Sequence, residues 1–165
     1  MTRVENPKIE PNTGQSGVAQ YDETLDELFG YHLKRAVNVL QLDLKAALKP
    51  FDLRMLTYTA LVLIVDNPGL RQSQLADAMD VERPNMVVII DTLESRELIS
   101  RDRVLTDRRA YALHATLGGR RLCEKATIAV KDHEDRLLHE LSPEMRQTVI
   151  AALKLIRKVG GGAVT

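Results

Sequence analysis

Residues 72–116 have the sequence QSQLADAMDVERPNMVVIIDTLESRELISRDRVLTDRRAYALHAT. The first eight of these residues predict a short helix. A tight turn is predicted at Asp80 and Val81, because aspartate tolerates a left-handed backbone better than most residues do. A second helix is predicted over 83–97, with Pro84 in its first turn, where a missing N–H has no cost.

A small hairpin is predicted next, from the extended segments 99–103 and 109–115 with the polar residues 104–108 between them. A short helix, a turn, a second helix and a basic hairpin together make a winged helix-turn-helix, whose second helix lies in the major groove of DNA. Double-stranded DNA is therefore the predicted partner.

The local charge supports this prediction although the total charge does not. The chain has 23 basic and 23 acidic residues, so its formal net charge is zero. Residues 99–121 nevertheless carry a local charge of +4, and residues 1–30 carry −4. We therefore expect a DNA contact that is confined to one part of the molecule.

Amphipathic helices are predicted before this unit. Apolar residues at every third or fourth position predict one long helix over 21–48, which ends before Pro50. The segment 53–66 is helical by its length, although the apolar run 60–65 alone also fits a buried strand.

Two more helices are predicted after the hairpin. Thr116 is placed to cap a long helix that continues to Leu141. Residues 142–144, Ser-Pro-Glu, then give the start signal of a last helix, which ends at Val159 before three glycines. The predicted fold class is mainly α with a small β hairpin (α+β): a winged helix-turn-helix with long N- and C-terminal dimerisation helices.

A homodimer follows from the geometry of DNA. Two recognition helices on a two-fold axis can occupy successive major-groove faces about 34–36 Å apart, and the long apolar stripes at both ends supply an interface. The predicted organisation is a flexible tail over 1–20, an N-terminal dimerisation helix over 21–52, a winged helix-turn-helix DNA-binding module over 53–116, C-terminal dimerisation helices over 117–159 and a flexible tail over 160–165.

The composition is that of an ordinary soluble domain, with 165 residues of which 44% are hydrophobic and 28% are charged. The longest apolar run has six residues, against about 20 for a membrane-spanning helix. The amino terminus has no charged-then-apolar signal pattern. The sequence therefore predicts a cytoplasmic protein with no membrane partner.

Candidate DNA contacts open both helices of the central unit. Arg83 and Asn85 are the residue types that read guanine and adenine edges by paired hydrogen bonds, each pair giving about 1–3 kcal/mol of discrimination. They flank Pro84. Residues 72–74 open the first helix, where N–H groups and short polar side chains suit a phosphate, although helix capping explains them equally well.

The hairpin supplies the remaining candidates. Asp107 can hold the guanidinium of Arg109 while a neighbouring arginine enters a narrow minor groove. Arg120 and Arg121 are interpreted as a solvated face. The complete set of candidate DNA-binding residues is Gln72, Ser73, Gln74, Arg83, Pro84, Asn85, Arg103, Asp107, Arg108 and Arg109.

No pattern indicates an enzyme. The sequence has no phosphate-binding glycine loop, nucleophile elbow or metalloprotease motif, and its four histidines form no i, i+4 pair. We expect no catalytic residue, no cofactor and no metal site. Two alternatives to a ligand-controlled DNA-binding regulator stay open. One is a helix-turn-helix used for protein association, and the other is a regulator gated by oxidation of Cys123, whose apolar neighbours instead favour an ordinary buried thiol.

A series of short motifs in this chain resembles the MarR family of bacterial transcription regulators. The motifs are Asn67-Pro68-Gly69-Leu70, Gln74-Leu75-Ala76, Val81-Glu82-Arg83, Asp91-x-Leu93-Glu94, Leu98-Ile99, Thr106-Asp107-Arg108-Arg109, Thr116-x-x-Gly119 and Leu141-Ser142-Pro143-Glu144. The resemblance implies an obligate homodimer that reads a palindrome, with an Asp-x-Arg wing motif at Asp107 and Arg109 and a recognition helix that starts at residues 83–85. Asp80 departs from the glycine that is usual at the turn.

The same resemblance implies an effector. Many members of the family release DNA when a small, often aromatic and anionic ligand binds between the dimerisation helices and the DNA module. His32, Arg35, Arg54 and Tyr58 lie on the two predicted helices beside that cleft and are the candidate effector-pocket residues. Ordinary surface and packing positions explain them equally well. The implied function is a repressor that a small organic ligand releases from its operator.

Overall fold

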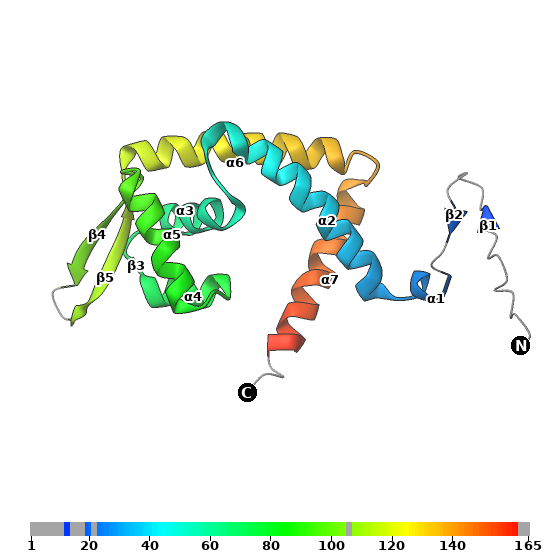
Figure 1. Ribbon diagram of the computed structural model, residues 1–165, viewed down its shortest axis with the longest axis horizontal. Coiled ribbons are helices and arrows are strands. Elements are labelled where there is room, and N and C mark those ends of the chain that lie inside the picture. The colour runs from blue at the N-terminus through cyan, green and yellow to red at the C-terminus, as the bar shows by residue number, and fades with distance from the viewer. Residues whose placement is uncertain (1–11, 14–18, 21–22, 105–106, 162–165) are drawn as a thin grey trace, which may run out of the picture. The chain divides into compact units, whose positions relative to one another are not determined.

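A computed structural model describes the protein at residues 12–13, 19–20, 23–104 and 107–161. The elements, in chain order, are β1 (Asn12–Thr13), β2 (Ala19–Gln20), α1 (Glu23–Asp26), α2 (Phe29–Leu48), the 3₁₀ turn η1 (Lys49–Phe51), α3 (Met55–Asp66), β3 (Leu70–Arg71), α4 (Gln72–Met79), α5 (Arg83–Ser95), β4 (Ile99–Val104), β5 (Asp107–Ala115), α6 (Leu117–Leu137) and α7 (Pro143–Gly161) (Figure 1). The predicted fold class, mainly α with a small sheet, is confirmed. The contacts divide the chain into two units, one ending at Gln41 and the other beginning at Leu42.

The first unit corrects the prediction of one continuous helix over 21–48. The structure has α1 and α2 in its place, with a break at residues 27–28. Nε2 of His32 lies 2.6 Å from the backbone carbonyl oxygen of Asp26, which is the acceptor that the N–H of Gly30 would use in a continuous helix. The break therefore coincides with this contact between the imidazole and the Asp26 carbonyl group.

Most of the two predicted tails, 1–20 and 160–165, lies outside the residues that the structure describes. Within the first tail, β1 and β2 form a short antiparallel pair, which the sequence does not predict. At the other end, α7 continues to Gly161, two residues beyond the predicted end at Val159.

The helix-turn-helix forms from α4 and α5 as predicted. Asp80 follows α4 at φ 51° and ψ 47°, which is the left-handed backbone expected of the turn. The N–H of Val81 donates to the carbonyl oxygen of Ala76 at 3.1 Å and closes the turn. α5 ends at Ser95, two residues before its predicted end, because Glu97 has a positive φ of 55° that cannot continue a helix.

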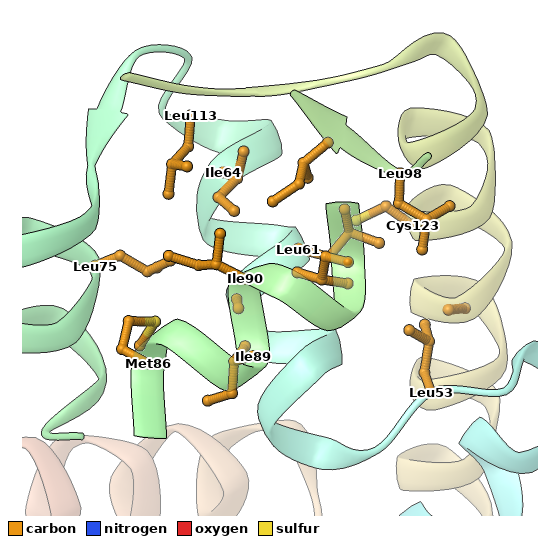
Figure 2. Packing of buried hydrophobic residues seen from close by; sticks show 14 of the residues in the cluster. Leu53, Leu61, Ile64, Leu75, Met86, Ile89, Ile90, Leu98, Leu113 and Cys123 are labelled. Carbon is orange, nitrogen blue, oxygen red and sulfur yellow. The ribbon is translucent and has the colours of Figure 1, made fainter. Parts of the chain in front are cut away.

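A single aliphatic core joins α3, α4, α5, the sheet and α6 (Figure 2). Residues 60–65 belong to a helix and not to a strand, and Ala60, Leu61 and Ile64 bury one side of it. The buried side of α5 consists of Met86, Ile89, Ile90 and Leu93. The other buried apolar residues are Leu48, Leu53, Leu75, Ala76, Leu98, Ile99, Leu113, Cys123 and Ala126.

The sheet of this unit has three antiparallel strands in the order β3-β5-β4. Strands β4 and β5 confirm the predicted hairpin. Strand β3 is not predicted, since a strand of two residues leaves no alternating pattern in the sequence. It forms after Gly69, which has φ 87° and donates its N–H to the carbonyl oxygen of Leu113 at 2.9 Å. This pairing joins the loop between α3 and α4 to the hairpin.

The helix α6 begins at a side-chain cap, as predicted. Oγ1 of Thr116 accepts a hydrogen bond from the N–H of Gly119 at 2.9 Å and donates to the carbonyl oxygen of Glu97 at 2.8 Å. The N–H of Thr116 also donates to the carbonyl oxygen of Leu98 at 3.0 Å. The start of α6 is therefore held against the segment that leads into β4.

The end of α6 differs from the prediction, since the helix stops at Leu137 and not at Leu141. The guanidinium of Arg146, on α7, accounts for the difference. It donates to the carbonyl oxygen of Leu138 at 2.8 Å and to the carboxylate of Asp135 at 2.6 Å. The carbonyl group of Leu138, which a longer α6 would pair within the helix, is bonded by Arg146 instead.

In the ranges that the structure describes, no helix combines the length and the apolar character that crossing a bilayer requires. The same ranges contain no group of three or more histidine, cysteine, aspartate or glutamate side chains placed to hold a metal ion.

Replacing Gly119 by alanine is expected to destabilise the protein. The added Cβ would lie 2.0 Å from the carbonyl oxygen of Leu98, so the start of α6 would have to move. We expect the free energy of unfolding to fall by at least the cost of overpacking, about 1–3 kcal/mol. Gly118→Ala is the matched control, because its Cβ would meet only Oγ1 of Thr116 at 3.6 Å. Equal urea midpoints for the two variants would contradict the close approach at Gly119.

Candidate nucleic-acid interface

The start of α5 leaves its polar side chains available to a partner. Arg83, Pro84 and Asn85 are all exposed, and the residue before them, Glu82, makes no side-chain cap. Neither Arg83 nor Asn85 makes a side-chain hydrogen bond within the part of the chain that the structure describes. Both side chains therefore keep the donors that could bind base edges or phosphates.

The two valines of α5 lie on a side that the protein does not cover. Val87 is 40% exposed and Val88 is 64% exposed, while Met86 and Ile90 on the other side are fully buried. The helix therefore presents an exposed apolar side next to its exposed polar start.

Arg101, on β4, binds two carboxylates of α5. Its Nε donates to the carboxylate of Glu94 at 2.8 Å, and its Nη2 donates to the carboxylates of Glu94 and Asp91. The hydrogen bond with Glu94 raises the pKa of the Arg101 guanidinium above its ordinary value. Arg101 is one of the arginines that give residues 99–121 their local charge of +4, but it neutralises two carboxylates of α5. Its structural effect is to join the hairpin to the helix.

Arg103 lies two residues further along β4, opposite Tyr111 of β5, and its side chain is exposed. It makes no ion pair with any residue that the structure describes, so its charge can meet a phosphate. The backbones of Asp107, Arg108 and Arg109 belong to β5, but their side chains lie outside the described part of the chain.

One of the three candidate phosphate-binding residues at the start of α4 has a helix-capping hydrogen bond. Oε1 of Gln74 accepts a hydrogen bond from the N–H of Arg71 at 3.0 Å, across the start of the helix. Ser73 is exposed and Gln72 is half-buried. The role of these residues in phosphate binding stays a prediction.

An open hollow of about 850 Å³ lies between the start of α3, the turn after α4 and one side of α5. Arg54 and Asn85 are the candidate site residues that line it, together with Val88. Arg96 forms part of the wall and donates to the carbonyl oxygens of Phe51 at 3.0 Å and Asp52 at 2.5 Å. The hollow thus adjoins the side chains that α5 offers to a nucleic acid.

The other three candidate effector residues have partners of their own. Tyr58 donates its hydroxyl to Oγ1 of Thr127, on α6, at 3.1 Å. The guanidinium of Arg35 lies 5.4 Å from the ring centroid of Tyr31 and donates to its hydroxyl at 2.8 Å. His32 bonds the backbone of Asp26, as described above. His32 and Arg35 belong to the first unit and Arg54 and Tyr58 to the second, so a shared pocket stays a prediction.

Cys123 is a buried thiol in α6, with 5% of its surface exposed. Burial raises the pKa of this thiol above its ordinary value, although a hydrogen bond with Thr127 acts in the opposite direction. The thiolate, which is the form that oxidants attack, is therefore scarce at neutral pH. The favoured interpretation of Cys123 as a small buried side chain is confirmed, and the geometry gives no support to oxidation as a control.

The hydrogen bonds from Arg101 to α5 and the hollow beside this helix are not predicted from the sequence. A partial signal for the first is present, because Asp91 and Glu94 are three residues apart and so share a helix side. The hollow has no such signal, since the residues around it come from separate segments of the chain.

The chain is similar to known transcription regulators. A model of the MarR family matches residues 53–111. A putative transcriptional regulatory protein for the hcr operon of Thauera aromatica is 42% identical over 97 residues, which is 59% of this chain. The chain spans 58% of the length of that relative.

Two solved structures cover most of the chain. The transcriptional repressor CouR, bound to a 23-mer DNA duplex, is 34% identical with a TM-score of 0.80, and the match covers 84% of this chain and 99% of that one. CouR from Rhodococcus jostii RHA1, bound to p-coumaroyl-CoA, is 28% identical with a TM-score of 0.74, and the match covers 81% of this chain and 94% of that one.

The two arginines of β4 are expected to respond differently to replacement by methionine. Arg103→Met should lower the salt dependence of DNA binding by about one counterion and leave the melting temperature unchanged. Arg101→Met should destabilise the protein by about 1 kcal/mol and weaken DNA binding without that loss of salt dependence. Fluorescence anisotropy over a salt series and thermal melts measure both quantities. A reversed pattern would show that Arg101 is the phosphate contact.

Proposed function

This chain belongs to the MarR family of DNA-binding transcription regulators, and from that premise we propose that it is a homodimeric cytoplasmic repressor. In this proposal it binds a palindromic operator and leaves it when a small aromatic ligand binds. The observation that carries the proposal is the pair α4–α5 with Arg83 and Asn85 exposed at the start of the second helix. The DNA duplex bound to the related repressor supports it.

Each protomer places its α5 in one half of the operator. Asn85 and Arg83 contact bases or phosphates at the helix start, and Pro84 sets the first turn. Arg103 and the wing residues Asp107, Arg108 and Arg109 contact the flanking backbone and minor groove. Residues 72–74 contribute phosphate contacts from the start of α4. All ten candidate residues thus belong to one proposed DNA interface.

The helix α7 supports the homodimer. Its apolar residues Val149, Leu153 and Ile156 share one side at helical spacing, and they are 50%, 39% and 47% exposed. A stripe of this length along a 19-residue helix is more than scattered apolar exposure. A second copy of this chain is the proposed cover, because two α5 helices are needed to read a palindrome.

DNA binding by the full chain tests the main proposal. We expect the protein to shift a duplex from the DNA upstream of its own gene at physiological salt. Leu153→Glu should abolish the shift by placing a charge in the dimer interface, whereas Gln147→Glu, on the opposite side of α7, should not. If the helix-turn-helix instead served protein association, the wild-type protein would give no shift. A shift that Leu153→Glu leaves intact would contradict the dimer.

An aromatic thioester is the proposed class of effector. The ligand of the related repressor, p-coumaroyl-CoA, combines an aromatic ring with charged phosphates. Arg54 lines the hollow and makes no ion pair with any described residue, so it can meet a negative group there. Because Asn85 and Val88 line the same hollow, an occupant would contact the side of α5 that DNA uses. Participation of His32, Arg35 and Tyr58 in effector binding stays a prediction.

Binding of such an effector is expected to change both the thermal stability of the protein and its affinity for DNA. We expect p-coumaroyl-CoA to raise the melting temperature and to weaken operator binding tenfold or more, which needs about 1.4 kcal/mol of preference for the DNA-free form. Arg54→Ala should lose most of this response, and Arg136→Ala, an exposed arginine of α6, should keep it. A melting temperature that p-coumaroyl-CoA leaves unchanged would contradict this class of effector.

A further inference from the structure

The outward side of α5 carries a short apolar strip in addition to its polar start. Pro84, Val87, Val88 and Asp91 have the spacing i, i+3, i+4 and i+7, so they follow one side of the helix. All four are exposed, with Val88 at 64% and Val87 at 40%. This side lies away from the buried residues of α5, so the strip contributes little to the core.

The charge and polarity of the residues around this strip are compatible with contact to DNA. Arg83 lies just before it, and Asn85 lies within it along the chain. The only acidic member of the strip, Asp91, is paired with Arg101. The strip therefore presents methyl groups between cationic and polar side chains, without an uncompensated carboxylate that would repel phosphates.

We propose that Val87 and Val88 contact the 5-methyl groups of thymines in the major groove, so that α5 selects thymine at defined operator positions. The 5-methyl group of thymine is the apolar feature that a base pair offers on its major-groove edge, and apolar side chains recognise it by direct contact. Cytosine has no methyl group at this position. The inference rests on the proposed function, because it requires α5 in the major groove.

This selection differs from the hydrogen-bonded readout assigned to Arg83 and Asn85. Those side chains bind donors and acceptors on guanine and adenine, whereas a valine senses only shape and desolvation. The side chain of Val88 also lines the hollow beside α5. An effector in the hollow would therefore contact a residue that reads the operator.

Deoxyuridine substitution tests the inference, because deoxyuridine differs from thymidine only by the missing methyl group. The full-length protein is first used to select its preferred duplex from a random pool. Each thymine of that duplex is then replaced by deoxyuridine in turn, and affinity is measured by fluorescence anisotropy. We expect a loss of about fourfold at one or more positions, as for the burial of one methyl-sized group.

The protein variants assign the loss to a side chain. Val88→Ala and Val87→Ala should each bind the thymine duplex more weakly than the wild-type protein does. For each variant there should be one operator position at which replacing thymine by deoxyuridine no longer changes the affinity. Val88→Thr, which replaces one of the two methyl groups by a hydroxyl group and keeps the other, should lose only part of the sensitivity at the Val88 position. Ser95→Ala, at an exposed site in the last turn of α5, should lose as much affinity as the wild-type protein does when thymine is replaced by deoxyuridine. Thermal melts of all variants check that each is folded.

Two results would overturn the inference. One is a wild-type protein that binds every deoxyuridine duplex as tightly as the thymine duplex, and the other is a set of valine variants that keep the whole wild-type loss. Failure to select any duplex would instead overturn the proposed function, and this inference with it. The two failures are therefore distinguishable.

Discussion

The DNA-binding unit depends on the burial of one side of α5. Met86, Ile90 and Leu93 are fully buried in a core that includes residues of α3, α4 and the sheet. The chain has no tryptophan and only two phenylalanines, so aliphatic side chains supply this packing. Their removal from water holds the helix in one rotational setting. Its exposed side is thereby set as well, and that side carries the polar and apolar groups proposed to read DNA.

Ion pairs contribute less to this arrangement than the burial of aliphatic side chains does. The formal net charge is zero, and part of the local positive charge is used inside the protein. Arg101 binds Asp91 and Glu94, so the hairpin and the helix are joined by the same contact that neutralises two carboxylates. Arg103, on the same strand, keeps its exposed charge. A count of arginines therefore overstates the charge that a nucleic acid can meet.

The features predicted correctly are those with local causes. The turn at Asp80, the cap at Thr116 and the limits of α4 each depend on residues within a few positions. The features predicted wrongly involve contacts that no periodic pattern in the sequence shows. His32 lies against the carbonyl of Asp26 at the break in the first helix, and Arg146 binds the connection after α6. Strand β3 exists because Gly69 meets Leu113, a residue that lies far away in the sequence.

The sequence by itself determined the helix-turn-helix, the hairpin and the residues offered at the start of α5, because helix periodicity, turn chemistry and capping act over short stretches of chain. It also carried the motifs by which the family is recognised. Only the tertiary structure decided that Arg101 joins the hairpin to α5 and that Val88 is exposed beside a hollow. Burial and ion pairing depend on which distant residues meet, and the order of residues along the chain does not specify those meetings by any local rule.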